Sequence, residues 1–354
     1  MSLLVRRSGR LSTLQREDCS GLHGGGALGP WDRFAHRSAN LLVGNDARAA
    51  VLEMTLQGGV LQAQQELLAA ICGADMGAEL DGERVPLWRP FRLPAGSLLS
   101  LGYAVQGCRS YLAVAGGLDG ARGEAALQAG DVLDAGTPTL PSRRLLQAWG
   151  RRDGRHAAPG YVSTYIRPVY AALPTLRFIR GREAEGLTDE SMRSFCTGSF
   201  KVAMESGRIG CLLEGAKLTL QAGASDAPSA PVAGSLAGST VATGGELIGS
   251  PGSGGEATSS ATLGGDAGDP GTLLLPASGQ PCLLMTSGPV AEGYARIGRV
   301  ISADLPLAAQ VKPGSYMRFE EVSPAEAQML QLLQQLDLRF LQAGLKMWVQ
   351  DYAK

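Results

Sequence analysis

The sequence predicts a mainly β protein built from barrels or sandwiches. Glycine is frequent, with 49 residues in 354, and 44% of the chain is apolar. Short apolar runs recur and are separated by Gly, Pro and Asp, which is the pattern of an all-β barrel or sandwich. A chain of this length and apolar content can form two or three domains, each with its own core. The runs cover residues 50–56, 67–72, 97–102, 111–115, 273–275, 282–285 and 300–303.

The predicted organisation is two barrels followed by a helix, over residues 1–150, 151–322 and 323–354. Residues 221–271 consist almost wholly of Gly, Ser, Ala, Thr and Pro. Such a segment cannot offset its ordering entropy, so we expect a poorly ordered insertion in the second barrel. The arginine-rich segment 143–158 is expected to be an irregular link between the barrels.

Two helices are predicted. Residues 32–42 have their apolar side chains near one face and end at Gly44-Asn45, which tolerates left-handed backbone geometry. The segment Ser323-Pro324-Ala325-Glu326 supplies a serine N-cap, a proline at the first helical position and a glutamate three residues on. The apolar residues that follow recur at helical spacing, so one face should lie on the second barrel or on a partner. They are Met329, Leu332, Leu333, Leu336 and Phe340.

Composition excludes several classes of partner. The 32 Lys and Arg residues balance 33 Asp and Glu residues, and only 18% of the chain is charged. It therefore lacks the basic surface that nucleic acid or anionic lipid requires. No apolar run reaches the roughly eighteen residues of a membrane span, and the start does not resemble a signal peptide, so we expect a cytoplasmic protein. The six cysteines include no Cys-x-x-Cys pair, as expected for reduced thiols.

The known cofactor and catalytic motifs are incomplete in this sequence. Residues 24–29 fit G-x-G-x-x-G, but no strand precedes them and Pro30 follows, so a flexible loop is favoured. Residues 210–217 have glycines at P-loop spacing, yet Ala216 replaces the lysine. The segment 344–347 contains a lysine but closes a helix, so biotin attachment is not predicted. The three histidines have no metal-pair spacing and no G-x-S-x-G elbow occurs, so neither a metal site nor a serine-hydrolase site is predicted.

Several segments resemble the KipA family, also called allophanate hydrolase subunit 2, a biotin-dependent carboxyltransferase family. Residues 39–45 read Ala-Asn-Leu-Leu-Val-Gly-Asn, and residues 107–119 read Gly-Cys-Arg-Ser-Tyr-Leu-Ala-Val-Ala-Gly-Gly-Leu-Asp. Further matches are Gly279-Gln280-Pro281 and the segment 293–304, so the resemblance extends over most of residues 11–319. It implies a fold of two cyclophilin-like β-barrels.

The resemblance also implies a substrate-binding set of polar residues. An amide such as a lactam or urea requires a carboxylate for its N–H and amide or guanidinium donors for its carbonyl oxygen. A structural interpretation stays open, in which Asn40 and Asn45 cap a helix and Glu53 is a buried acceptor. No catalytic residue is assigned. The substrate-binding candidates are Gln15, Asp32, Asn40, Asn45, Glu53, Arg109, Tyr111, Gln280, Tyr294 and Arg296.

The chain departs from the family pattern in three places. Arg16 to Cys19 replaces an Asp-x-Gly-Arg sequence, and a long Gly-Ser-rich loop expected after Asp119 is missing. Residues 289–295 replace a Thr-Gly-Gly-Tyr-Pro type of sequence, and Ser287 replaces a usual aspartate. Each lost hydrogen bond would be worth about 1 kcal/mol. The fold is therefore better supported by the resemblance than the activity.

The family includes one of the subunits of bacterial 5-oxoprolinase, and this resemblance implies a function. The chain would act in an ATP-dependent complex that hydrolyses 5-oxoproline to glutamate, together with a KipI-like subunit and a LamB/YcsF-like subunit, and would be inactive alone. ATP would be used by the complex without a recognisable motif in this chain. Two alternatives stay open: a KipA-like binding protein that antagonises a KipI-like kinase inhibitor, and a carboxyltransferase subunit of a biotin-dependent urea or amide carboxylase.

Overall fold

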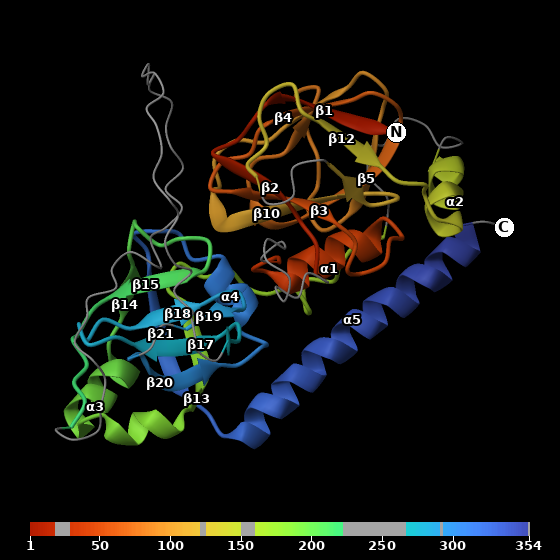
Figure 1. Ribbon diagram of the computed structural model, residues 1–354. Coiled ribbons are helices and arrows are strands. Elements are labelled where there is room, and N and C mark those ends of the chain that lie inside the picture. Colours follow the sequence, from red (N-terminus) through yellow and green to blue (C-terminus); the bar gives the residue numbers. More distant parts are fainter. Residues whose placement is uncertain (18–28, 121–124, 150–159, 222–266, 291–292, 353–354) are drawn as a thin grey trace, which may run out of the picture.

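The computed structural model describes the chain except for residues 18–28, 121–124, 150–159, 222–266, 291–292 and 353–354. The described part forms two β units, and a long C-terminal helix runs along both of them (Figure 1). The predicted mainly β class with a C-terminal helix is confirmed. Most of the predicted insertion at 221–271 and of the predicted loop at 24–29 lies outside the described residues. None of the described helices combines the length and apolar character needed to cross a membrane.

The first unit consists of two antiparallel sheets. Seven strands form one sheet, in the order β11 (Leu118–Asp119), β12 (Val132–Ala135), β1 (Ser2–Arg7), β4 (Val60–Ala63), β9 (Leu98–Ser100), β6 (Glu79–Leu80) and β7 (Glu83–Arg84). Five strands form the other, in the order β2 (Leu11–Gln15), β3 (Val51–Thr55), β10 (Gln106–Val114), β5 (Leu67–Asp75) and β8 (Pro90–Leu93). Side chains from both sheets fill one hydrophobic core.

The five-stranded sheet is buried on both faces. Along β5, Ile71 belongs to the core between the sheets, whereas its neighbour Cys72 belongs to a second core on the opposite face, as strand alternation requires. Helix α1 (Arg33–Leu42) covers this second face, and α2 (Leu140–Trp149) and α5 (Pro324–Tyr352) pack beside it (Figure 1). The apolar runs of β5 and β10 are therefore continuous rather than alternating.

Helix α1 has the ends that its sequence predicts. Asp32 is the N-cap, and its Oδ1 accepts a hydrogen bond from the Ala35 amide at 2.8 Å. Beyond the last turn, Gly44 has φ +77°, and a Cβ there would lie 2.8 Å from Ser142 Oγ at the start of α2. The close approach of α2 therefore requires glycine at this position.

The second unit is a closed barrel of seven strands. All neighbouring pairs are antiparallel except β13–β21, which closes the barrel in parallel. The 3-10 helix η1 (Arg182–Gly186), α3 (Asp189–Thr197) and α4 (Leu305–Ala309) lie in its connections, and β16 (Ala267–Gly268) pairs with β19 (Gly288–Pro289). The barrel order is β13 (Thr175–Arg180), β20 (Ala295–Val300), β17 (Thr272–Leu275), β18 (Cys282–Leu284), β15 (Gly210–Glu214), β14 (Phe200–Val202) and β21 (Tyr316–Glu321).

Helix α5 starts as predicted but packs with a different face. Ser323 Oγ accepts from the Glu326 amide at 3.2 Å, and Pro324 is the first helical residue. Of the two expected places for the apolar face, the second barrel or a partner, the barrel is wrong: the face is exposed in this chain, and Phe340 is 71% exposed. The helix buries Ala327 against Ile301 and Val322 of the barrel unit, and Leu341 in the core beneath α1. Helical spacing alone could not distinguish these two apolar faces.

Other sequence predictions need correction. Residues 143–149 were predicted to be irregular but belong to α2. The Ser142 hydroxyl donates to Val43 O at 2.6 Å and so attaches the start of α2 to the end of α1. The run 300–303 is not a strand, because β20 ends at Val300 and a turn leads into α4. Helix α3 was missed although Thr188 caps it by accepting from the Ser191 amide. That N-cap signal is visible in the sequence.

The barrel core generates a stability prediction. Phe195 of α3 is fully buried and stacks on Phe319, with ring centroids 4.6 Å apart. Phe195→Ala should lower the free energy of unfolding by about 3–5 kcal/mol, because it leaves a cavity that the barrel cannot fill. The matched control Phe340→Ala, on the exposed face of α5, should change it by less than about 0.5 kcal/mol. Urea denaturation measures both, and equal losses would contradict this packing.

Candidate functional site

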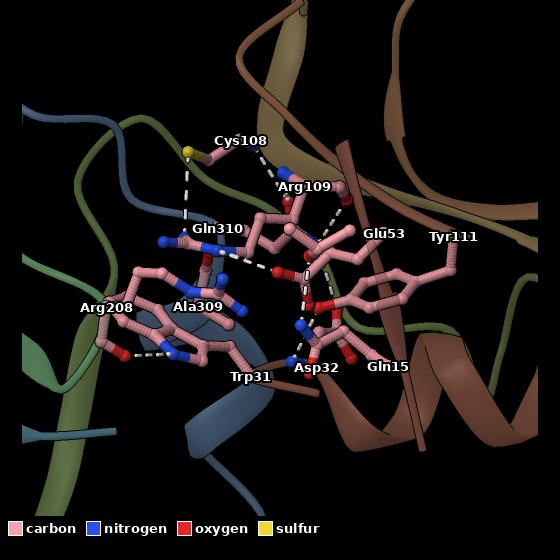
Figure 2. Close-up of polar contacts among 11 residues, drawn as sticks. Gln15, Trp31, Asp32, Glu53, Cys108, Arg109, Tyr111, Arg208, Ala309 and Gln310 are labelled. Carbon is pink, nitrogen blue, oxygen red and sulfur yellow. Dashed lines mark hydrogen bonds and ion pairs between the residues drawn. The ribbon is translucent and has the colours of Figure 1, made fainter. Parts of the chain in front are cut away.

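Polar side chains from both β units meet at the junction between them (Figure 2). Strands β2, β3 and β10 are neighbours, and Glu53 of β3 pairs in register with Thr13 on one side and Tyr111 on the other. Arg109 lies two residues before Tyr111, so both side chains leave the same face of β10. We call this group the interface cluster. It comprises Gln15, Trp31, Asp32, Glu53, Cys108, Arg109, Tyr111, Arg208, Ala309 and Gln310.

Asp32 lies at the centre of the cluster and is fully buried. Its Oδ2 accepts from the Tyr170 hydroxyl at 2.7 Å and from Gln310 Nε2 at 2.9 Å. Its backbone N–H donates to the Tyr111 hydroxyl at 2.9 Å. Burial raises the pKa of the Asp32 carboxyl to about 6, against hydrogen bonds that favour the charged form. Asp32 can therefore change its protonation near neutral pH.

Gln310, at the end of α4, joins the two β units. Its Oε1 accepts from the backbone amides of Cys108 and Arg109 at 2.8 and 2.9 Å. Its Nε2 donates to Asp32 Oδ2 and to Arg109 O, both at 2.9 Å. Gly107 has φ +77°, and a Cβ there would lie 2.7 Å from Gln310 Oε1. The glycine therefore makes room for this amide.

Arg109 is held on three sides. Its Nη1 donates to Ala309 O at 2.5 Å, and its guanidinium lies 3.7 Å from the ring centroid of Trp31. Trp31 in turn packs into the barrel core and donates from Nε1 to Arg208 O at 3.0 Å. Arg109 Nε lies 3.9 Å from Glu53 Oε1, at the limit of an ion pair. The cation–π contact and the carbonyl fix the guanidinium beside the Glu53 carboxyl.

Glu53 is the least satisfied member of the cluster. Its side chain is 8% exposed, and its Oε2 has no hydrogen-bond partner among the described residues. An unpartnered buried carboxyl oxygen is costly, typically by about 1–3 kcal/mol or more. The site can therefore accept a hydrogen bond from the N–H of a bound molecule, next to the Arg109 guanidinium.

Gln15 closes the cluster on the β2 side. In the amide orientation that satisfies both of its ends, Nε2 donates to Gly29 O at 3.1 Å. Oε1 then accepts from Arg208 Nη2 at 2.7 Å and from Thr13 Oγ1 at 2.9 Å. Gln15 thus forms a second link from the first unit to the barrel.

Asn40 and Asn45 lie at the opposite end of α1 from Asp32. Asn40 Nδ2 donates to Ala49 O at 2.8 Å, and Asn45 Nδ2 donates to Val114 O at 2.8 Å. Asn45 also donates to Asn40 Oδ1 at 3.0 Å and accepts from the Gly116 amide at 2.8 Å. These bonds tie the end of α1 to the end of β10, as the structural interpretation of the asparagines expects.

The remaining candidates are in the barrel and are not members of the interface cluster. Gln280 pairs with the backbone of Gly215, donating at 3.2 Å and accepting at 3.1 Å. Tyr294 packs on a small apolar cluster beside β17 and β18, and burial raises the pKa of its hydroxyl. Arg296 donates from its backbone amide to Glu183. The structure therefore gathers five of the ten candidates: Gln15, Asp32, Glu53, Arg109 and Tyr111.

Sequence reasoning missed several members of the site. Gln310 and Arg208 come from the barrel, and no local pattern marks either of them as an interface residue. Tyr170, which donates to Asp32, lies in the connection between the units. Trp31 adjoins Asp32 and could have been found as an aromatic next to a helix cap. No group of three or more His, Cys, Asp or Glu side chains that could hold a metal occurs within the described part of the chain.

A pH-dependent stability is expected from Asp32. Its folded-state pKa of about 6 exceeds that of an unfolded aspartate, so its contribution to stability is full below about pH 4 and is lost as the pH rises through 6. Tyr170→Phe removes a donor to the carboxylate and should raise this pKa further. The variant should lose about 2 kcal/mol at alkaline pH and less in acid.

Carboxyl carbon NMR titration measures the pKa, and urea unfolding at about pH 5 and pH 8 measures the stability, on either side of the transition. The matched control is Tyr165→Phe, because Tyr165 is 98% exposed. An unchanged or lower Asp32 pKa in Tyr170→Phe would show that the hydroxyl does not stabilise the charged form.

Comparison with known proteins relates this sequence to a family. The family described as carboxyltransferase domain, subdomain A and B, matches residues 23–321. The chain is 28% identical over 331 residues to the C subunit of 5-oxoprolinase from Escherichia coli, covering 92% of this chain and 93% of that one. It is also 41% identical over 91 residues to urea amidolyase of Saccharomyces cerevisiae, covering 26% of this chain and only 5% of that protein.

The same fold occurs in a solved structure. The crystal structure of Kluyveromyces lactis urea amidolyase superposes with a TM-score of 0.71 at 19% identity, over 96% of this chain and 20% of that one. At this identity the likeness concerns the fold alone. The match of the family over most of the sequence, including every candidate residue except Gln15, shows that the chain belongs to the carboxyltransferase domain family, subdomains A and B.

Proposed function

We propose that the chain is a subunit of an ATP-dependent 5-oxoprolinase that hydrolyses 5-oxoproline to glutamate in the cytoplasm. The observation that carries this proposal is the similarity to the C subunit of 5-oxoprolinase, which extends over nearly the whole length of both chains. A KipI-like and a LamB/YcsF-like subunit would complete the complex. The chain by itself would be inactive.

The interface cluster supports an amide substrate. A lactam presents one N–H donor and one carbonyl acceptor. Glu53 Oε2 accepts no hydrogen bond from the described residues, and Arg109 supplies a fixed positive charge beside it. In this proposal Glu53 accepts from the lactam N–H while the guanidinium stabilises negative charge that develops on the carbonyl oxygen.

The proposal assigns ATP to the partner subunits. The glycines at 210–217 lack the lysine of a Walker motif, and Gly210 and Gly215 instead pack against backbone and Phe200 in the barrel. Biotin is not attached to this chain in the proposal, because Lys346 lies within α5 rather than in a hairpin. The role left to this chain is to bind and orient the amide.

A second candidate is a carboxyltransferase subunit that acts with a biotin-dependent partner on urea or a related amide. The local 41% identity to urea amidolyase favours it. Both candidates require an acceptor for an amide N–H, so the cluster alone does not separate them. Assays of the reconstituted complex with 5-oxoproline and with urea plus biotin separate them by the substrate consumed.

Glu53 provides the mutational test. In the complex reconstituted with the KipI-like and LamB/YcsF-like subunits, Glu53→Gln should reduce glutamate release by about 100-fold or more, because a donor replaces an acceptor of the same volume. The thermal unfolding temperature should be maintained, since Oε2 makes no hydrogen bond with the described residues. The control Glu205→Gln changes an exposed residue and should leave the rate unaltered.

Two outcomes would contradict the proposal. Glutamate release by the purified single chain would show that the partners are not needed. An inactive unmutated complex that still assembles would show that the chain is a binding protein, as expected if the departures at Ser287 and residues 289–295 had removed the site.

A further inference from the structure

A cavity of about 700 Å³ lies where the connection between the two units crosses the first unit. Its walls come from β5, from residues 84–88, from the start of β10 and from residues 164–170. We call it the linker cavity. It is separate from the interface cluster but shares a wall with it, because Tyr170 lines the cavity and donates its hydroxyl to Asp32. This volume is within the usual range for small-molecule sites.

Arg167 is the main charged group in the wall. It is half-buried, and its Nε donates to Val162 O at 2.6 Å. Its guanidinium lies 5.7 Å from the ring centroid of Trp88 and 5.9 Å from that of Tyr161. It forms no ion pair with a carboxylate of the described residues. These contacts orient the guanidinium but do not neutralise it.

The surroundings of Arg167 are electropositive. Arg89 lies 4.9 Å from the centroid of the same Tyr161 ring. Burial lowers the pKa of the Arg167 guanidinium, and the charge of Arg89 acts in the same direction. A third arginine, Arg84, has only a loose pairing with Asp75 at 3.8 Å, and its side chain is 68% exposed. Positive charge therefore exceeds negative charge around the cavity.

Trp88 gives independent support for a built site. Its backbone has φ +60°, which is a strained conformation for a bulky residue. Its N–H donates to Ile71 O at 2.7 Å, and its carbonyl accepts from the Val162 amide at 2.9 Å. These two hydrogen bonds hold the Trp88 backbone in place. Strain of this kind concentrates at ligand sites. Here it places the tryptophan in the wall next to Arg167.

We propose that the linker cavity binds a small organic acid through its carboxylate, with Arg167 as the anchor. Because Nε is used by Val162, the two terminal nitrogens are the edge left to form a paired hydrogen bond with a carboxylate. The apolar wall formed by Val85, Leu87 and Trp88 receives the carbon skeleton. This inference does not depend on the proposed function, since binding requires neither partner subunits nor turnover.

Isothermal titration calorimetry on the full chain tests the proposal with two acids, 5-oxoproline and benzoate. Their neutral counterparts, 5-oxoprolinamide and benzamide, have the same shape without the charge. At least one acid should bind saturably and about tenfold or more tighter than its amide. Inorganic phosphate should bind more weakly than that acid, because it does not use the apolar wall.

Three variants complete the test. Arg167→Gln should weaken binding of the acid by about tenfold or more, whereas Arg143→Gln, on the exposed side of α2, should not change it. Thr164→Glu serves as a second variant if Arg167→Gln does not fold. Thr164 lines the cavity and is exposed, so a carboxylate there should repel the acid without disturbing the core.

Several results would overturn the proposal. They are the absence of saturable binding of both acids up to concentrations on the order of 10 mM, equal binding of acids and amides, and binding unaffected by both cavity variants. If phosphate bound as tightly as the acids, the cavity would be a general anion site rather than a carboxylate site. Because none of these measurements involves catalysis, failure here leaves the oxoprolinase assay as an independent result.

Discussion

The structure depends on one side-chain amide. Gln310 comes from the barrel, yet all of its side-chain hydrogen bonds go to Asp32 and to the backbone of Cys108 and Arg109 in the first unit. Buried amides are stable only when their donors and acceptors are satisfied, so this geometry leaves little freedom for the two units to shift. It also links Asp32, at the start of α1, to the backbone of Arg109 on β10.

The same junction sets the electrostatics of the site. Removing Asp32 from water disfavours its charged form, whereas hydrogen bonds from Ala35, Gln310 and Tyr170 favour it. Burial is the larger effect, which leaves the carboxyl poised between its two protonation states near neutral pH. Arg109 differs, because the Trp31 ring and a backbone carbonyl contact its guanidinium directly, whereas the Glu53 carboxylate lies 3.9 Å from Nε.

Patterns within short stretches of sequence predicted the features that depend only on neighbouring residues. The caps of α1 and α5 and most apolar strands follow from neighbouring residues, and the cluster members on β2, β3 and β10 follow from the family pattern. Gln310 and Arg208 could not be found this way, because their roles arise only when the barrel docks on the first unit. Helix α5 shows the same limit: Phe340 and Leu341 are both apolar, and only tertiary packing decides that Leu341 is buried.

Glu53 gives the clearest evidence that the junction does more than hold the two units together. Most polar groups in the cluster form hydrogen bonds with one another. Their presence can therefore be explained by the need to hold the two units together. The exception is Glu53 Oε2, which is buried without a partner among the described residues and therefore destabilises the fold. Glutamine at this position would have nearly the same volume without a buried charge. The Glu53 carboxyl group lowers stability, and it lies next to a guanidinium that the other unit holds in place. This combination argues that the junction binds a molecule with an N–H group.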